Sequence, residues 1–142
     1  MEEIIRILHG KGCSLVVRSV AGEVSDYAQP GVRDLIWLMD HEPERLRGAS
    51  IADKVIGKAA AGLAVRAGVV RIYAEVLSRA AVPLLDEAGI DYSFGQLVDR
   101  IVIPEGDDRC PLEQIVAPAE DAAQVETLLR LHFEEMRRQS QT

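Results

Sequence analysis

An almost continuous run of apolar residues, Val-Val-Arg-Ile-Tyr-Ala-Glu-Val at 69–76, lies in the middle of the chain. An apolar run of this length is typical of a β-strand that is covered on both faces of a sheet, as strands in parallel sheets are. Helical patterns precede and follow this run, which predicts right-handed crossover connections between parallel strands. We therefore expect an α/β fold, with a three-layer α-β-α architecture and a mixed sheet.

The other segments predict elements on both sides of this strand. In chain order they are a helix over 2–8, a hairpin of strands 14–19 and 23–27 at one edge of the sheet, a helix over 32–39, strands over 90–94 and 97–103, and a final helix over 120–138. No internal repeat or linker interrupts the 142 residues, so the prediction is a single domain over 1–142.

The segment 50–68 is predicted to form one helix that is rich in small residues. Ser50 followed by Asp53 fits an N-terminal capping pattern. Gly57 and Gly62 each cost a helix about 1 kcal/mol relative to alanine, so we expect a packing contact or a ligand to require them. The small side chains leave the helix thin on one side, where another backbone can approach closely.

The net charge of −7 limits the classes of partner. An acidic surface repels phosphate, and no stripe of basic and aromatic residues offsets it, so nucleic-acid binding is not expected. No apolar run approaches the ~20 residues that span a bilayer, and the first residues lack a secretory pattern, so no membrane association is expected. The two cysteines, Cys13 and Cys110, are expected to stay reduced in the cytoplasm.

Three segments, 52–61, 73–78 and Cys-Pro-Leu-Glu at 110–113, together with the order of the elements, resemble the cytidine deaminase-like superfamily. More closely, the chain is similar to a bacterial family within it, domain of unknown function family 1893. The resemblance implies a cytidine deaminase-like fold. Active members of the superfamily hold zinc with a His or Cys at the start of one helix and two Cys at the start of the next, beside a proton-carrying Glu.

The chain departs from that pattern at both helix starts. The helix expected from Ser50 carries Asp53, Lys54 and Lys58 where a His-x-Glu motif would stand, and the helix expected from Ser78 has no cysteine. None of the three histidines shares a short motif with a cysteine, whereas a zinc site needs three or four converging donors. We therefore expect no metal, no cofactor and no zinc-dependent deamination.

The expected binding site is a cleft where the two helix N-termini meet the carboxyl edge of the sheet, because such termini attract anions. Lys54 and Lys58, one turn apart on the same predicted helix, are candidates for binding a phosphate or carboxylate. The alternative is that both lie on a solvated helix face. Asp53 is a candidate ligand-binding residue, and the alternative is that it only caps the helix.

Glu75 and Ser78 stand near the carboxyl end of the predicted strand 69–76. Burial of Glu75 would raise the pKa of its carboxyl toward the range of a general base, so it is a candidate catalytic residue. The alternative is that it reaches solvent or a lysine. Ser78 is a candidate ligand-binding residue, and the alternative is that it caps a helix ending at Gly89.

Cys110 is a candidate catalytic nucleophile or redox thiol, because it precedes Pro111 at an expected helix start, where a thiolate is favoured. Glu113 can bind a ligand, carry a proton or cap that turn. The alternative for Cys110 is a small buried hydrophobe, which is also the expectation for Cys13.

These patterns leave three functional hypotheses open. The first is a domain that binds a nucleotide-like or other small anionic ligand in the cleft. The second is a zinc-independent enzyme that uses Cys110, with Glu75 or Glu113 as proton carrier. The third is a structural or regulatory subunit, a homo-oligomer in which the thin helix packs against a copy of itself.

Overall fold

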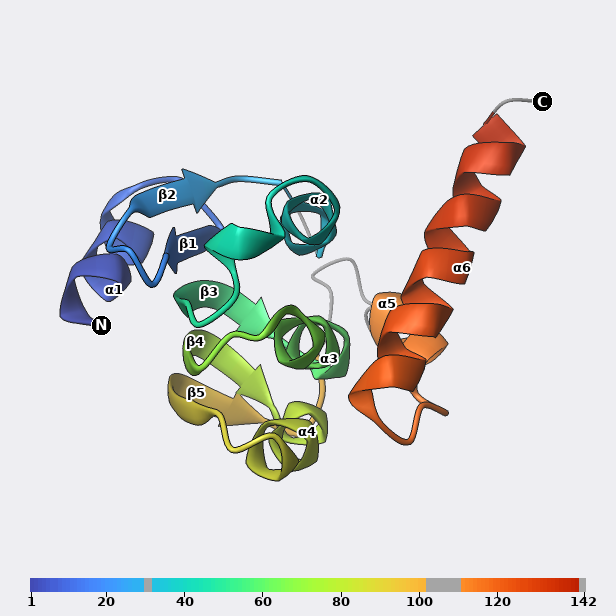
Figure 1. Cartoon of the computed structure of the whole chain (residues 1–142). Helices are drawn as coiled ribbons and strands as arrows, with labels where there is room; N and C mark the ends of the chain where they lie inside the picture. Colours follow the sequence, from blue (N-terminus) through green and yellow to red (C-terminus); the bar gives the residue numbers. More distant parts are fainter. Residues whose placement is uncertain (30–31, 102–110, 141–142) are drawn as a thin grey trace.

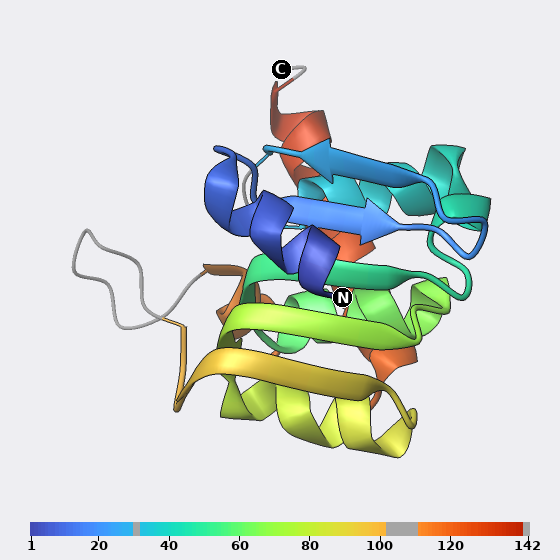
Figure 2. The same ribbon diagram turned by 90° about the vertical axis from the view of Figure 1, so that its left-hand side faces the viewer.

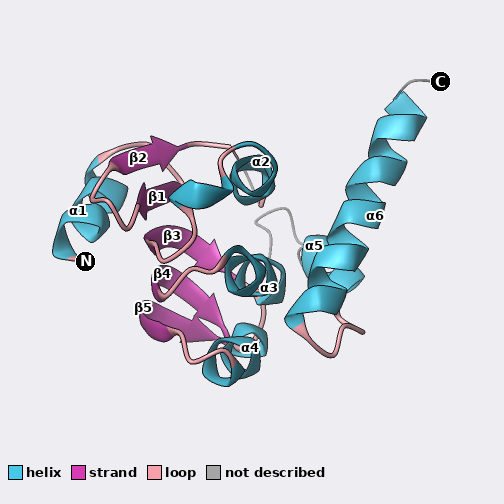
Figure 3. Cartoon of the chain, in the orientation of Figure 1, coloured by secondary structure: helices cyan, strands magenta, loops and turns pink. Residues whose placement is uncertain are grey.

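The computed structural model describes residues 1–29, 32–101 and 111–140. Its centre is a five-stranded sheet with the strand order β2-β1-β3-β4-β5, and helices lie on both sides of the sheet (Figure 1, Figure 3). The strands are β1 (Leu15–Arg18), β2 (Val24–Tyr27), β3 (Ser50–Ile56), β4 (Arg71–Ser78) and β5 (Asp91–Val98). The helices are α1 (Glu2–Gly10), α2 (Arg33–His41), α3 (Lys58–Ala67), α4 (Val82–Glu87), α5 (Pro111–Val116) and α6 (Ala122–Ser140), with short 3-10 helices η1 (Pro43–Arg45) and η2 (Arg79–Ala81).

The sheet is mixed, as predicted. Strand β1 pairs antiparallel with β2 on one side and with β3 on the other. Strands β3, β4 and β5 are parallel, and α3 and α4 make the connections between them. The expected α/β fold and the hairpin at one edge of the sheet are therefore confirmed.

The prediction of one helix over 50–68 is wrong in its first half. Residues Ser50–Ile56 form β3, a strand of the sheet interior, and the helix begins only after Gly57, which has an extended backbone. Ile51 packs against the helices on one face of the sheet and Ala52 packs under α1 on the other, so both residues are buried. A strand covered on both faces loses the apolar–polar alternation that distinguishes it from a helix, which explains the error. The prediction that the helix ends at Gly68 is confirmed, because Gly68 follows the last residue of α3 and has a left-handed backbone with φ of 86°.

The helices form more layers than the three that were expected. Helix α1 covers β1 and β3 on one face and leaves the corresponding face of β4 and β5 open (Figure 2). Helices α2, α3 and α4 cover the opposite face, and α6 lies outside α3, farther from the sheet (Figure 1). Because α1 covers only part of its face, β4 is buried on the α3 face alone, with Tyr73 and Glu75 partly exposed on the other.

The small residues of α3 serve packing within the chain. A Cβ atom at Gly62 would lie 2.5 Å from Cγ1 of Val125, a buried residue of α6. The thin side of the helix is therefore covered by α6, and the expectation that it packs against a copy of itself is wrong.

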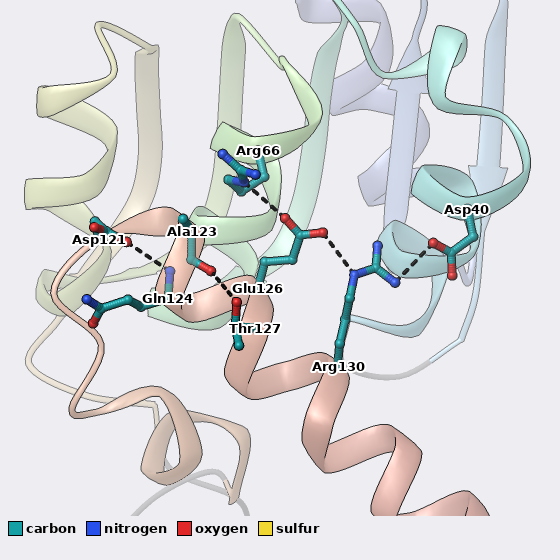
Figure 4. A network of polar contacts seen from close by, with 8 residues as sticks. All are labelled: Asp40, Arg66, Asp121, Ala123, Gln124, Glu126, Thr127 and Arg130. Carbon is teal, nitrogen blue, oxygen red and sulfur yellow. Dashed lines mark hydrogen bonds and ion pairs between the residues drawn. The ribbon is translucent and has the colours of Figure 1, made fainter.

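Ion pairs also join α6 to α3 and to α2 (Figure 4). Glu126 accepts from Arg66 of α3 at 3.0 Å and from Arg130 at 2.9 Å, and Arg130 reaches Asp40 of α2 at 3.0 Å. These hydrogen bonds lower the pKa of the Glu126 carboxyl despite its partial burial.

Two apolar clusters stabilise the sheet. The larger lies between the sheet and helices α2, α3, α4 and α6. The smaller lies under α1 and contains Ile4, Leu8, Cys13, Val16 and Ala52, so the prediction that Cys13 belongs to the core is confirmed. The predicted strands 90–94 and 97–103 are one strand, β5, and residues 102–103 lie outside the described part. Within the described residues, no helix has the length and apolar character needed to cross a membrane.

Candidate functional site

A cavity of about 230 Å³ lies where the carboxyl end of β3 meets the N-terminus of α3. Its walls are mostly apolar, and its polar side chains come from Ser14 just before β1, from β3 and from α5. The lining residues are Ser14, Val32, Asp53, Lys54, Val55, Gly57, Ala59, Ala60, Ile101, Leu112 and Glu113. The predicted location, at the carboxyl edge of the sheet, therefore contains a cavity.

A second cavity of about 190 Å³ adjoins the first and shares Ile101 and Glu113 with it. Polar side chains make up more of its wall, namely Lys58, Ser78, Asp99 and Arg100. Five of the predicted binding residues line one cavity or the other: Asp53, Lys54, Lys58, Ser78 and Glu113.

Glu113 occupies the N-terminus of α3. The backbone N–H of Lys58 donates to Oε1 of Glu113 at 2.8 Å, and the N–H of Ala59 donates to Oε2 at 3.0 Å. A carboxylate at this end of a helix satisfies otherwise unpaired N–H groups and interacts favourably with the helix dipole. A Cβ at Gly57 would overlap this carboxylate, so the need for glycine at Gly57 has a packing reason. The anion at this helix terminus is thus supplied by the chain itself.

The side chain of Lys58 makes a second contact between α3 and the chain that follows α5. Its Nζ donates to the backbone carbonyls of Ala117 at 3.0 Å and Ala119 at 2.6 Å, just after α5 ends. Lys54 lies instead in β3, four residues earlier, with an exposed side chain. The prediction that Lys54 and Lys58 share one helix face is therefore wrong, because the helix starts at Lys58.

Asp53 lies in β3 and is only 8% exposed. The prediction that it caps a helix is wrong. Its Oδ1 accepts a hydrogen bond from the N–H of Val55 at 3.2 Å. Burial raises the pKa of this carboxyl to about 7, against the opposing effect of the peptide N–H groups of Val55 and Lys54, and nearby Asp34 of α2 raises it further. The cavity therefore contains an acid that exchanges its proton near neutral pH.

Ser78, at the end of β4, is buried, and its Oγ accepts a hydrogen bond from the N–H of Ala80 in η2. This contact is the capping alternative that the sequence left open. The hydroxyl still borders the second cavity.

Glu75 lies away from both cavities. Its side chain is 44% exposed on the open face of β4, where it accepts hydrogen bonds from the His9 ring and, at 2.9 Å, from the Tyr73 hydroxyl. These bonds, with the His9 contact first, lower the pKa of the Glu75 carboxyl. The expectation of a buried general base with a raised pKa is wrong, because α1 leaves this part of the sheet open.

Cys110 lies outside the described residues, so its predicted role as nucleophile stays a prediction. In active members of the cytidine deaminase-like superfamily, the zinc ligands stand at the starts of two helices. The corresponding positions of this chain would be the starts of α3 and η2. The residues there, Gly57 to Ala59 and Ser78 to Ala80, supply no His, Cys or free carboxylate, and the Glu113 carboxylate is already bonded to peptide N–H groups. Among the residues the structure describes, no three His, Cys, Asp or Glu side chains are grouped to hold a metal ion. These residues do not fit a zinc ion.

Sequence reasoning missed several residues of the site. The first cavity is also lined by Ser14 just before β1, by Val32 at the start of α2 and by Leu112 of α5. Arg100 and Asp99 reach the second from the residues after β5. Gly57, which also lines the first cavity, did leave a signal in the sequence, because a glycine inside a predicted helix implies a close contact.

The model of a family described as TM1506, domain of unknown function (DUF1893), matches residues 3–133. The crystal structure of a DUF1893 family protein (TM1506) from Thermotoga maritima is similar, with a TM-score of 0.79 and 25% identity over 94% of this chain and 88% of that chain. No curated protein shows a significant match. With most of its length matched by the family model, this chain belongs to the DUF1893 family.

Proposed function

We propose that this chain is a cytidine deaminase-like domain that binds a nucleotide-like small molecule in its two adjoining cavities. The ring of the ligand lies in the first cavity and its anionic group lies in the second. The observation that supports this proposal is the contrast between the two cavities, one mostly apolar and one with basic side chains, on either side of Ile101 and Glu113.

The size of each cavity limits what it accepts. An engineered cavity of about 150 Å³ accommodates benzene, so about 230 Å³ accommodates one ring system with polar substituents. Sites for larger ligands measure about 300–1,000 Å³. A nucleotide-like ligand therefore has to extend from the first cavity into the second.

The existing contacts of the charged side chains in the second cavity indicate which of them can bind the anionic group of the ligand. The N-terminus of α3 already carries Glu113, and Lys58 already donates to backbone carbonyls. Asp99 is paired with Arg79 at 2.8 Å. Arg100 has no acidic partner within the described part of the chain, and it is the residue we assign to the anion.

The test measures the melting temperature with a panel of nucleosides and their monophosphates. We expect a larger rise with a monophosphate than with its nucleoside, and R100Q should remove that difference while R138Q on α6 leaves it. V55W, which fills the first cavity from an exposed position, should abolish both shifts. The proposal is wrong if no compound stabilises the protein, or if V55W and R100Q leave the shifts unchanged.

A second candidate function, a homo-oligomeric subunit, is favoured by the outer edge of β5. This edge strand has eight residues, and 92–98 are uncharged. The other edge, β2, has four residues and includes Asp26, which pairs with Lys11 at 3.2 Å. Proteins usually protect long edge strands with charges, and the β5 edge lacks this protection.

Antiparallel pairing of β5 with the β5 of a second copy would bury the exposed Phe94 without opposing like charges. Light scattering after size exclusion should then show a dimer that F94K dissociates. L131K, at an exposed leucine of α6, should leave the dimer intact. A monomer at all concentrations, or a dimer disrupted only by L131K, would overturn this assignment.

A further inference from the structure

The first cavity contains a carboxyl group in surroundings that disfavour its charge. Asp53 is more than nine-tenths buried, and its partners within the described residues are peptide N–H groups alone, that of Val55 at 3.2 Å from Oδ1 and that of its neighbour Lys54. Its strand neighbours in register are Leu15 of β1 and Ala74 of β4, both apolar. Each carboxyl oxygen has two lone pairs, so these peptide contacts leave the carboxyl group with capacity to pair with a ligand.

The charged groups around Asp53 give it no buried cation. Asp34 of α2 acts on it as a like charge, and the carboxylate of Glu113 on α5 lines the same cavity. Lys54, next to it in β3, is exposed. The other neighbouring parts of the cavity wall are uncharged, with Ser14 just before β1 and with Ala59 and Ala60 of α3. A neutral acid in such a place has one O–H donor beside one carbonyl acceptor.

We propose that Asp53 enters the complex as the neutral acid and recognises a cyclic amide edge of the ligand through two parallel hydrogen bonds. The acid O–H donates to the ligand carbonyl, and the carbonyl oxygen of Asp53 accepts the ligand N–H. No covalent bond forms or breaks in this step. The inference deepens the proposed function, because it rests on a ligand ring in the first cavity, and it names the ring chemistry that this cavity selects.

Recognition by the neutral acid couples binding to protons. With the pKa of Asp53 at about 7, most of the protein is competent to bind at pH 6, and each pH unit above 7 lowers the competent fraction about tenfold. Binding above neutral pH therefore takes up one proton from solution.

The test uses 2-pyridone, a single ring with an N–H beside a carbonyl, and N-methyl-2-pyridone, which lacks the donor. NMR titration of the full chain gives the dissociation constant at pH 6 and pH 8.5. We expect 2-pyridone to bind about 30-fold more weakly at pH 8.5. N-methyl-2-pyridone should bind at least tenfold more weakly than 2-pyridone at pH 6.

Two variants separate hydrogen bonding from shape. D53N keeps one donor and one acceptor in the same place and cannot ionise, so it should bind 2-pyridone equally at both pH values. D53L keeps a side chain of similar size without hydrogen bonds and should lose binding at both. Binding of 2-pyridone that is equal to that of its N-methyl analogue, absent at pH 6, or still pH-dependent in D53N would overturn the inference.

The outcomes also separate this inference from the proposed function. Nucleotide stabilisation that depends on Arg100 but not on Asp53 or pH would overturn the inference and leave the proposed function standing. Pyridone binding that depends on Asp53, without any stabilisation by nucleosides or nucleotides, would support the inference about Asp53 and overturn the proposal of a nucleotide-like ligand.

Discussion

Glu113 and Lys58 hold α5 and α3 together by exchanging contacts with each other's helix ends. The Glu113 carboxylate accepts hydrogen bonds from the first N–H groups of α3, at Lys58 and Ala59. The Lys58 ammonium donates to the carbonyls that follow α5, at Ala117 and Ala119. Each charge lies at the helix end that its sign favours. Both residues line the second cavity, so the contact that joins α5 to α3 is also part of the wall of the candidate site.

Loss of the Glu113 carboxylate should destabilise the protein. E113A leaves two peptide N–H groups without their partners, and we expect it to lower the free energy of unfolding by about 2–3 kcal/mol in urea denaturation. E113Q retains one acceptor and should cost about 1 kcal/mol. E87Q, at an exposed glutamate of α4, serves as the control and should change little. Equal stability of E113A and the native protein would show that this contact does not form in solution.

Enlarging Gly62 should displace α6. A methyl group at Gly62 collides with Val125, so G62A should lower the unfolding free energy by about 1–3 kcal/mol, although alanine favours helices. G10A, in α1 with open space around it, should be neutral or slightly stabilising. In a double-mutant cycle, V125A should relieve the cost of G62A. If the effects of G62A and V125A on the unfolding free energy are additive, Val125 of α6 does not contact Gly62.

Asp53 should make stability depend on pH. Below pH about 4 its carboxyl is neutral in both states. Between about pH 4 and 7 only the unfolded chain releases this proton, so the contribution of Asp53 lowers stability as the pH rises, and above about 7 the loss is complete. D53N cannot ionise, so its stability relative to the native protein should increase by up to about 4 kcal/mol from pH 4 to pH 8. A constant difference between the two proteins across this range would contradict the raised pKa.

Cys13 should resist thiol reagents in the folded protein. It is 3% exposed under α1, and its Sγ lies 3.8 Å from the carbonyl of Ile7. In C110S, a disulfide reagent such as DTNB should therefore react only after urea unfolds the chain. A fast reaction of the folded wild-type protein would then come from Cys110. If the folded wild-type protein does not react, the hypothesis of a thiol enzyme is wrong.

Several features of the fold followed from the sequence because they depend on local patterns. The hairpin of β1 and β2, the helices α1 and α2, and the end of α3 at Gly68 are set by apolar spacing and by glycine conformation. The segments 52–61, 73–78 and 110–113 led to the prediction of the DUF1893 family. That prediction is confirmed, because the family model matches residues 3–133.

The sequence pattern failed where burial comes from distant parts of the chain. Ser50–Ile56 lacks the apolar–polar alternation of a half-buried strand, and it forms a strand because β1 and β4 supply hydrogen bonds on both sides. Glu75 was expected to be buried, but α1 covers only β1 and β3 on that face of the sheet, and Glu75 pairs with His9, 66 residues away in sequence.

The sequence by itself determined the fold class, the type of most elements and five side chains of the candidate site, because periodicity and helix ends are local properties. Only the tertiary structure decided how those side chains are used. The packing of α5 and α6 on α3 places Glu113 on the helix terminus and Val125 on Gly62. The pKa of Asp53 depends on how much water the assembled layers exclude, and no local pattern encodes that quantity.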